Sequence, residues 1–389
     1  MKSAACRWKL NQRQRAWVIA EEANMPKKFR VGVIGAGIAS RHLTGFAWNR
    51  ELYEVAVLCS LDEDRGRQLC EEFGIPEYTQ DAETMIARSD LDIIDICTPP
   101  SSHFELCRKA IEAGKHVICE KPLFGSIAEV DEMARIVARA EGPKLMPIFQ
   151  YRYGSGLQKL KMLIDLGLTG TPFLTTIETH WWRGPDYYAV PWRGKWVTEL
   201  GGGLLGHAIH AHDMLNYVHG ACAEIFSYGA TLVNPIEVED TAALSVKMKN
   251  GSLATLSMTL GSRKEISRLR FCFADLVVES ILEPYTMGRD PWSFIAGTEE
   301  HQKRVDEALA GYVIKEDGYT RQFELFHHAL LTHGDPPVTL EDARNSLELV
   351  TAAYHSQRTG QPTKLPILSD HPLYHSWLPE EERRLTAGA

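Results

Sequence analysis

Lys121 occupies a position where a lysine could take part in a reaction. It follows the apolar stretch 116–119, within the sequence Glu120-Lys121-Pro122, and lies downstream of a glycine turn at Gly35 and Gly37. Such a turn is typical of dinucleotide binding, and an ammonium group beside a nicotinamide ring stabilises the oxygen of an alcohol as it becomes a carbonyl. The combination predicts hydride chemistry.

A second group of chemically capable residues follows the glycine run 201–203. We expect a helix over 204–217, which places His207, His210 and Asp213 three residues apart on one face. A histidine there can accept a substrate proton while a carboxylate fixes its tautomer. The same spacing can chelate a metal ion, and it is equally compatible with a purely structural histidine. Spacing alone leaves these three interpretations open.

The glycine turn has the context of a dinucleotide-binding fingerprint, because it follows an apolar strand and opens a helix. Gly35 permits the tight turn, Gly37 lets the backbone approach a pyrophosphate, and Ser40 replaces the usual third glycine. Ile38 and Ala39 lead into the helix whose N-terminus would bind the phosphates. We therefore predict that this turn contacts a nucleotide.

The choice between NAD and NADP depends on the end of the second predicted strand. The acidic residue that bonds the ribose 2′-hydroxyl in NAD enzymes would fall near Ser60. A serine tolerates a 2′-phosphate, and Arg65 could reach one, but the three acids at 62–64 would repel it. We place Ser60 and Arg65 at the cofactor, with NAD favoured and NADP left open.

Strands and helices that position these residues alternate through the first part of the chain. Buried strands are expected over 29–34, 53–59, 91–97, 116–119 and 145–149, and helices from 40 and over 62–73, 102–113 and 127–140. Buried runs separated by amphipathic helices predict a parallel sheet covered on both faces. Residues 29–147 are therefore expected to form a doubly wound Rossmann domain.

Period-two patterns replace this alternation after residue 147. Such patterns occur at 173–180, 223–231, 241–248, 252–260 and 269–273, with helices expected over 157–166, 322–331 and 340–358. Alternation of this kind indicates a sheet with one covered face. Residues 148–389 are therefore predicted to form an α+β domain with a large open, mostly antiparallel sheet.

Composition excludes several classes of function. The chain has 389 residues and a formal net charge of -9, with its basic residues interspersed among acids, which argues against a nucleic-acid surface. Its eight cysteines form no C-x-x-C pair, which fits a reducing cytoplasm. No segment is apolar enough to cross a membrane.

Residues 1–28 are set apart by their basic composition. Their short apolar stretch, 16–20, is smaller than a secretory signal needs. We interpret them as a disordered extension, and Met25 as an alternative start of translation.

Several motifs together resemble the Gfo/Idh/MocA oxidoreductases, the family of glucose–fructose oxidoreductase and inositol dehydrogenase. The similarity runs from residue 30 to about 365, and its most specific motif is Glu120-Lys121-Pro122. The other matching stretches are 31–37, 97–100 with His103, 114–117, 150–153, the glycine run with His210 and Asp213, and 356–362.

This resemblance implies a catalytic role for Lys121 and for His210. Thr98, Pro99, His103 and Glu120 would line the nicotinamide side of the cofactor. Members bind NAD or NADP, act on a sugar or polyol carbon, and commonly form dimers or tetramers through the open sheet. Metal binding is not a trait of the family, so no metal site is expected.

One departure from the family pattern lies next to the histidine. Many members have an aspartate four residues before it, where this chain has Gly206. His210 would then work with Asp213, or its proton would leave through water. Our hypothesis places the substrate hydroxyl between Lys121 and His210, with His210 accepting the proton and Lys121 stabilising the alkoxide. Burial should lower the pKa of the lysine.

Substrate recognition is expected from the aromatic and basic segment 181–196. Rings stack on the C–H faces of a sugar while arginines bind its hydroxyls, although the same tryptophans could fill a core or a subunit interface. The residues predicted to bind substrate, besides the catalytic pair and Asp213, are Arg152, Arg183, Tyr188, Trp192 and Arg193.

Similarity to members that oxidise C3 of pyranosides or nucleotide sugars makes a glycoside or anhydrosugar the expected substrate. The alternatives are a lyase or hydrolase that recycles bound NAD through a 3-keto sugar, and a non-catalytic dinucleotide sensor.

Overall fold

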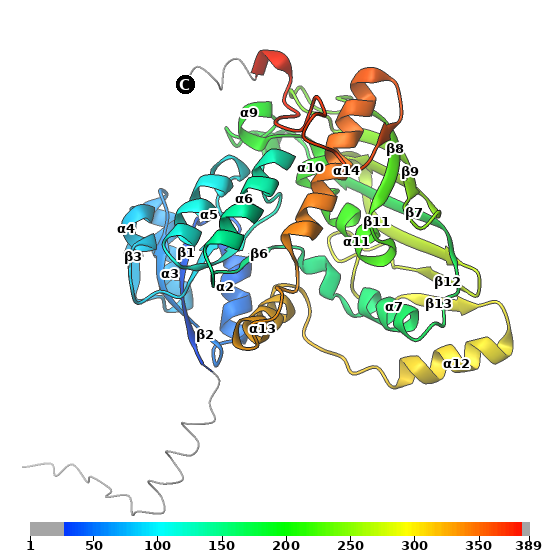
Figure 1. Cartoon of the computed structure of the whole chain (residues 1–389), viewed down its shortest axis with the longest axis horizontal. Coiled ribbons are helices and arrows are strands. Elements are labelled where there is room, and N and C mark those ends of the chain that lie inside the picture. Colours follow the sequence, from blue (N-terminus) through cyan, green and yellow to red (C-terminus); the bar gives the residue numbers. More distant parts are fainter. Residues whose placement is uncertain (1–26, 383–389) are drawn as a thin grey trace, which may run out of the picture.

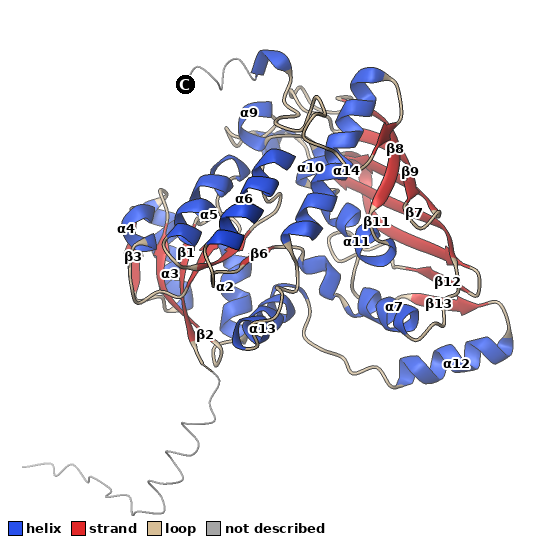
Figure 2. Ribbon diagram, viewed as in Figure 1, coloured by secondary structure: helices blue, strands red, loops and turns tan. Residues whose placement is uncertain are grey.

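The chain contains two β-sheets, each covered by its own helices (Figures 1 and 2). The structure is a computed structural model that describes residues 27–382. The extension predicted for residues 1–28 lies outside the described residues, apart from Lys27 and Lys28. Among helices in the described part of the chain, none is long and apolar enough to cross a bilayer.

The first sheet has six parallel strands in the order β3-β2-β1-β4-β5-β6, which confirms the predicted parallel sheet; β3 is the strand that the sequence did not predict. The strand order reverses between β1 and β4, and such a switch point leaves a crevice at the carboxyl ends of the strands. The strands are β1 (Phe29–Ile34), β2 (Tyr53–Cys59), β3 (Glu77–Thr79), β4 (Ile93–Ile96), β5 (His116–Cys119) and β6 (Leu145–Pro147).

Helices cover both faces of this sheet, which is why β4 is buried along its whole length and β5 from Val117 onward. Side-chain caps fix where some of these helices begin: Asp62 accepts from the backbone of Arg65, and Ser126 from that of Glu129. The helices are α2 (Ala39–Trp48), α3 (Glu63–Phe73), α4 (Ala82–Ile86), α5 (His103–Glu112) and α6 (Ile127–Arg139), with a 3₁₀ turn η1 (Pro100–Ser102) before α5.

The second sheet has eight strands in the order β13-β12-β11-β7-β10-β9-β8-β14. It is mixed and mostly antiparallel, because β7 and β10 pair in parallel while the other pairs run antiparallel. The strands are β7 (Pro172–Trp182), β8 (Cys222–Ala230), β9 (Thr241–Met248), β10 (Leu253–Thr259), β11 (Gly261–Phe273), β12 (Leu276–Glu279), β13 (Ser293–Ala296) and β14 (Thr363–Lys364).

Helices lie against one face of the second sheet (Figure 2), and exposed apolar side chains lie elsewhere on its strands. The strand residues Phe173, Tyr228, Leu253 and Ile295 are all exposed. The helices and turns of this half are η2 (Gln150–Tyr153), α7 (Ser155–Asp165), α8 (Pro185–Tyr188), α9 (Trp196–Glu199), α10 (Gly203–Gly206), α11 (Ile209–His219), α12 (Glu299–Ala310), α13 (Gly318–Leu331) and α14 (Leu340–Thr359).

Helix α13 crosses from the C-terminal half and packs on the first sheet's helix α2 (Figure 1). Phe323 stacks on Phe46 with ring centroids 4.4 Å apart, and the Tyr53 hydroxyl donates to the Phe323 carbonyl at 2.7 Å. Helix α13 therefore completes the helical layer around the N-terminal sheet, although it lies in the C-terminal part of the sequence. The predicted domain boundary at residue 147 did not anticipate this contact.

The helix expected over 204–217 is broken in two. Helix α10 ends at Gly206, α11 begins at Ile209, and His207 lies in the break. The buried Glu239 holds the start of α10 by accepting from the backbone N–H groups of Leu204 at 2.9 Å and Gly202 at 3.2 Å. The break gives His207 and His210 different orientations from those on one continuous helix.

Candidate active site

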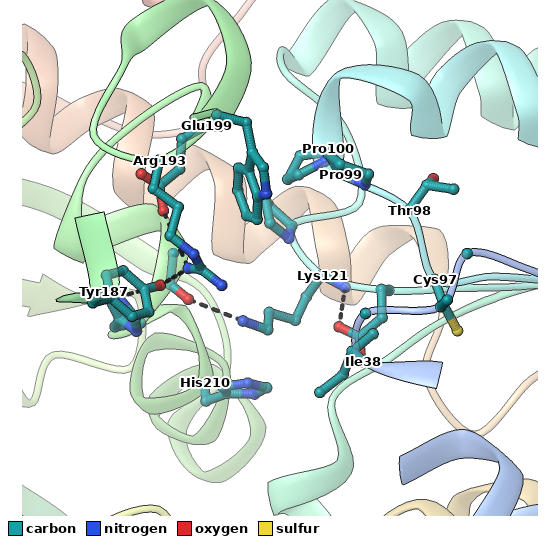
Figure 3. A pocket seen from close by; sticks show the side chains of 18 of the residues that line it. Ile38, Cys97, Thr98, Pro99, Pro100, Lys121, Tyr187, Arg193, Glu199 and His210 are labelled. Carbon is teal, nitrogen blue, oxygen red and sulfur yellow. Dashed lines mark hydrogen bonds and ion pairs between the residues drawn. The ribbon is translucent and has the colours of Figure 1, made fainter. Parts of the chain in front are cut away.

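A cavity of about 650 Å³ lies where the carboxyl ends of the first sheet meet the second domain (Figure 3). Residues directly after β1, β2, β4 and β5 form one wall, and segments around α8 to α11 form the other. Eight of the predicted cofactor residues line it, namely Gly35, Gly37, Ile38, Ser60, Thr98, Pro99, Glu120 and Lys121. Of the predicted substrate residues, Lys121, Arg183, Trp192, Arg193 and His210 line it.

The glycine turn at the end of β1 fits a dinucleotide. Gly35 has a φ of +106°, and a Cβ atom there would lie 2.6 Å from the Cys97 carbonyl oxygen, so only glycine fits. A Cβ atom at Gly37 would have no neighbour within 4 Å, so this glycine borders open space at the N-terminus of α2. Backbone N–H groups that face such a space bind phosphate oxygens. Ala39 is fully buried and is absent from the lining, so its contact with the cofactor stays a prediction.

The end of β2 presents a carboxylate to the cavity rather than a base. Ser60 and Asp62 both line it, and Ser60 Oγ accepts from the backbone N–H of Asp62 at 3.1 Å. Arg65 is absent from the lining, and its guanidinium donates to Gln68 Oε1 at 2.8 Å. The contact of Arg65 with the cofactor stays a prediction. The arrangement suits a ribose with free hydroxyls.

Lys121 extends from the end of β5 toward the second domain, where its Nζ donates to the Gly206 carbonyl oxygen at 2.9 Å (Figure 3). Its backbone N–H donates to Glu120 Oε2 at 2.9 Å. Burial lowers the pKa of the Lys121 amine from its usual value, against the opposing charge of Glu120. An amine with a lowered pKa loses and regains a proton more readily near neutrality.

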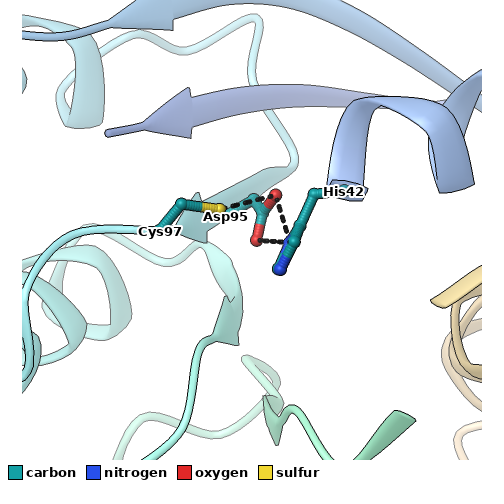
Figure 4. A group of neighbouring side chains, drawn as sticks. All are labelled: His42, Asp95 and Cys97. Atoms are coloured by element: carbon teal, nitrogen blue, oxygen red, sulfur yellow. Dashed lines mark hydrogen bonds and ion pairs between the residues drawn. The ribbon is translucent and has the colours of Figure 1, made fainter. Parts of the chain in front are cut away.

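Glu120 is fixed by a buried chain of polar groups behind the lysine. Its Oε1 lies 3.0 Å from His42 Nε2 and accepts from the Tyr319 hydroxyl at 2.8 Å. His42 Nδ1 lies 3.0 Å from both oxygens of Asp95, close to the thiol of Cys97 (Figure 4). Burial lowers the pKa of His42, but the charges of Asp95 and Cys97 and the hydrogen bonds to both residues together outweigh burial, so the pKa is raised.

The composition of this cluster is one that can hold a metal ion, since ligand atoms of His42, Asp95 and Cys97 lie within 4.8 Å of one another. A protonated imidazole has no free lone pair, however, and both His42 nitrogens already face carboxylates. The contacts therefore describe a hydrogen-bonded relay that holds Glu120, whose pKa falls to about 2 because the His42 hydrogen bond and charge outweigh burial.

His103 supports the cavity from behind, although it was predicted to line it. It is fully buried, with Nε2 2.8 Å from the Thr98 carbonyl oxygen and Nδ1 3.0 Å from that of Pro122. It therefore ties the loop after β4 to the loop after β5, and its predicted contact with the cofactor is corrected.

His210 faces the cavity from α11 on the side opposite the glycine turn. Its ring stacks on Tyr151 with centroids 4.4 Å apart, and its buried Nδ1 has no hydrogen-bond partner among the described residues. Burial, together with the positive charge of Lys121, lowers the pKa of His210 to about 3. The imidazole is therefore neutral at physiological pH and available to bind a hydroxyl.

Polar side chains complete the second wall, and among them Glu199 was not singled out by the sequence. Glu199 and Tyr187 line the cavity, and Arg193 Nη1 donates to the Tyr187 hydroxyl and lies 3.9 Å from Glu199 Oε1. His207 also lines it, with Nε2 3.3 Å from the Tyr187 hydroxyl. The predicted Tyr188 is absent from the lining, because the turn of α8 presents the neighbouring Tyr187 instead.

Arg152 and Asp213 form a buried ion pair outside this lining, which corrects their predicted contact with substrate. Arg152 Nε donates to Asp213 Oδ2 at 2.7 Å, and its Nη2 lies 3.0 Å from Asp342 Oδ1. Asp213 is only 1% exposed. Its carboxylate is therefore engaged by the arginine, and the idea that it assists His210 is corrected as well.

The cavity has further lining residues, most of which lie in the motif stretches or in the aromatic segment 181–196 noted in the sequence, whereas Leu61, Tyr285 and Tyr319 had no such signal. These further lining residues are Ala36, Leu61, Cys97, Pro100, Pro122, Gln150, Tyr151, Trp181, Gly206, Tyr285 and Tyr319.

Family models match both halves of the chain. Residues 29–147 match the model described as the oxidoreductase family with NAD-binding Rossmann fold, and residues 157–274 match the Gfo/Idh/MocA C-terminal domain. The myo-inositol 2-dehydrogenase of Thermotoga maritima is 28% identical, over 86% of this chain and 98% of that protein. The D-glucoside 3-dehydrogenase of Escherichia coli is 30% identical, over 49% of this chain and 54% of its own length.

A solved structure shares the fold. The WlbA dehydrogenase of Bordetella pertussis, in complex with NADH and UDP-GlcNAcA, superimposes with a TM-score of 0.76 at 24% identity, covering 88% of this chain and all of that one. The two matched family models, which together cover more than half of the chain, show that this chain belongs to the Gfo/Idh/MocA oxidoreductase family and carries its NAD-binding Rossmann domain.

Proposed function

We propose that the protein oxidises a secondary hydroxyl group of a sugar, glycoside, anhydrosugar or polyol with NAD. The observation that carries this proposal is that Lys121, His210 and the glycine turn line one cavity. A bound nicotinamide would supply the hydride acceptor. The residues of the chain must then bind the hydroxyl, orient its carbon and move its proton.

The electrostatics of the site favour Lys121 as the proton carrier. The sequence-based hypothesis gave the proton to His210, but a group whose pKa is about 3 is a weak base at neutral pH. Lys121 has a pKa lowered by burial, so its neutral amine can accept the hydroxyl proton. We therefore assign proton acceptance to Lys121, and orientation of the hydroxyl by hydrogen bonding to His210.

Oxidation at C3 of a glycoside is the more specific proposal. Buried Arg183 Nε and Gln150 Oε1 have no hydrogen-bond partner among the described residues, and both residues line the cavity, which suits a ligand with several hydroxyls. Both also line an adjoining cavity of about 760 Å³, which leaves room for an aglycone. The similarity to D-glucoside 3-dehydrogenase supports the same substrate class.

The cofactor preference and the assembly are further parts of the proposal. Asp62 at the cavity wall would repel the 2′-phosphate of NADP, so we propose NAD.

The exposed apolar residues of the second sheet support a homodimer or homotetramer formed through that sheet. The seven cysteines of the described residues are all free, which supports a cytoplasmic location.

The test is incubation of the purified protein with NAD and a panel of pyranosides, anhydrosugars and inositols. Absorbance of reduced cofactor and products by mass spectrometry are followed together. Accumulation of NADH with a keto product supports the dehydrogenase. Product without NADH would favour the alternative, a lyase or hydrolase that recycles its cofactor through a 3-keto sugar. Cofactor binding without any product would favour a sensor.

A further inference from the structure

Gly206 leaves an open space in the cavity wall beside Lys121. Outside its own helix and its chain neighbours, a Cβ atom built at Gly206 has one described atom within 4 Å, which is Oε1 of Glu199 at 3.8 Å. The carbonyl oxygen of the same glycine accepts the hydrogen bond from Lys121 Nζ. The carboxylate of Glu199 therefore faces the space that a side chain at position 206 would enter.

Glu199 is held in this orientation by the backbone. It is the last residue of α9, is only 7% exposed and lines the cavity. Its Oε2 accepts from the backbone N–H of Gly194 at 2.5 Å, which fixes one oxygen and leaves Oε1 toward Gly206. Arg193, at 3.9 Å from Oε1, is the only salt-bridge partner of Glu199 among the described residues.

The surroundings of Glu199 and Lys121 shift the pKa values of the two groups toward each other. Burial raises the pKa of Glu199, while Arg193 and Lys121 oppose the rise. Burial lowers the pKa of Lys121; Glu120 and Glu199 oppose that fall, and Arg193 and Arg183 add to it. Tyr188 is the other titratable group that senses the charge of Glu199. A proton passes most easily between groups whose pKa values have converged.

Glu120, the cavity carboxylate that precedes Lys121 in the sequence, is not available for this exchange. One of its oxygens is engaged by His42 and Tyr319, and the other accepts from the backbone of Lys121. Its pKa of about 2 keeps it ionised. Glu199 is thus the carboxylate that can take up and release a proton here.

We propose that Glu199 is the proton partner of Lys121. Its carboxylate, which belongs to α9, faces the space that a side chain at position 206 would occupy. In this step a bridging water carries the proton, because no ion pair within 4.0 Å joins the two groups. An N–H bond of the Lys121 ammonium breaks as the water takes that proton, the water gives a proton of its own to form an O–H bond on Glu199, and the electron pair stays on nitrogen. The inference rests on the proposed function only for the origin of the proton, which is the substrate hydroxyl.

The first experiment measures the pKa of Lys121 without substrate or cofactor. The rate of acetylation by trace acetic anhydride is followed against pH and quantified on the Lys121 peptide by mass spectrometry. Glu199→Gln keeps an oxygen for the Gly194 N–H but removes the charge. We expect a downward shift of about one pKa unit. Glu237→Gln is the control, because it removes a charge beside α9 from a residue outside the cavity lining. This variant should leave the pKa of Lys121 unchanged.

Rescue separates a proton partner from a merely structural residue. Gly206→Asp in the Glu199→Gln background places a carboxylate in the open space and should restore most of the shift, whereas Gly206→Asn should not. Gly206→Asp in the otherwise unchanged protein should raise the pKa of Lys121, a result that does not require Glu199→Gln to fold. An unchanged pKa in Glu199→Gln, or equal rescue by asparagine, would overturn the proposal.

Kinetics add a second readout once a substrate is identified. Glu199→Gln should lower kcat about tenfold, with KM within about twofold, and move the acidic limb of the kcat profile to lower pH. A rise in KM alone would assign Glu199 to substrate binding and contradict the relay. If the unchanged protein oxidises no sugar, the proposed function fails, while the labelling result still decides whether Glu199 acts on Lys121.

Discussion

The amine of Lys121 and the carbonyl oxygen of Gly206 are joined by a hydrogen bond of 2.9 Å that links the first sheet to the second domain. Lys121 belongs to the loop after β5, whereas Gly206 ends α10. The position of α10 is set in turn by Glu239, which accepts from the N–H groups at its start. The orientation of the reactive amine is therefore fixed by both domains.

Removing the amine should abolish turnover and spare cofactor binding. We expect Lys121→Ala to lower kcat about a thousandfold, because a positioned acid–base group contributes on the order of 10² to 10⁴. The affinity for NADH, measured by its fluorescence, should change less than about threefold. Lys303→Ala, on the exposed face of α12, is the control. Turnover within tenfold of the unchanged protein would refute the role of the lysine.

Asp62 should set the preference for NAD over NADP. Asp62→Ser removes the charge at the cavity wall while serine still caps α3, so stability should change little. We expect the ratio of kcat/KM for NAD to that for NADP to fall about tenfold, because the 2′-phosphate is no longer repelled. Asp64→Ser, which alters the same helix outside the lining, should leave the ratio unchanged. Equal ratios in both variants would contradict the assignment.

The sequence predicted the N-terminal sheet well because its strands are buried on both faces. Strands β1, β2 and β5 begin and end where the apolar runs do, since each run is bounded by turn residues or charges. In β11 the charged residues Arg263, Lys264 and Glu265 hide the period-two pattern, so only its last part was predicted. In β11, strand prediction failed where a run of charges interrupts the alternation.

The cavity wall from the second domain could not be predicted at the same level. Glu199 and Tyr187 carry no distinctive spacing, and they reach the site only because α8, α9 and the break after α10 fold around it. Arg152 and Asp213 looked like binding residues because arginine and aspartate near a motif suit a sugar. Their burial against each other depends on packing between η2 and α11, which no local pattern reveals.

The Arg152–Asp213 pair should support stability rather than substrate binding. Arg152→Met leaves a buried carboxylate unpaired, so we expect a loss of about 3 to 5 kcal/mol in the free energy of unfolding, measured in urea. The double variant Arg152→Met/Asp213→Leu should lose less, because the unpaired charge is gone. An increase in KM with unchanged stability would instead restore the sequence-based assignment to the substrate.

His212 should make the fold sensitive to acid. Burial lowers its pKa from 6.5 to about 3, so the folded protein binds fewer protons than the unfolded chain below pH 6.5. Its contribution to stability is therefore full above pH 6.5 and lost as pH falls toward 3. Between pH 6.5 and pH 5 this loss amounts to about 2 kcal/mol. His212→Leu should flatten this dependence in urea unfolding, whereas His328→Gln on an exposed site should not.

Gly35 and Gly37 offer a matched pair in which one glycine serves the fold and the other the ligand. A methyl group at Gly35 would meet the Cys97 carbonyl and would force a side chain into a positive φ, so Gly35→Ala should lower the melting temperature by several degrees. A methyl group at Gly37 meets nothing within 4 Å, so Gly37→Ala should melt within about 2 °C of the unchanged protein. Because that open space is where the backbone must approach a pyrophosphate, Gly37→Ala should weaken NADH binding at least tenfold. NADH titration and thermal unfolding of both variants test the assignment. It fails if Gly37→Ala binds NADH as tightly as the unchanged protein.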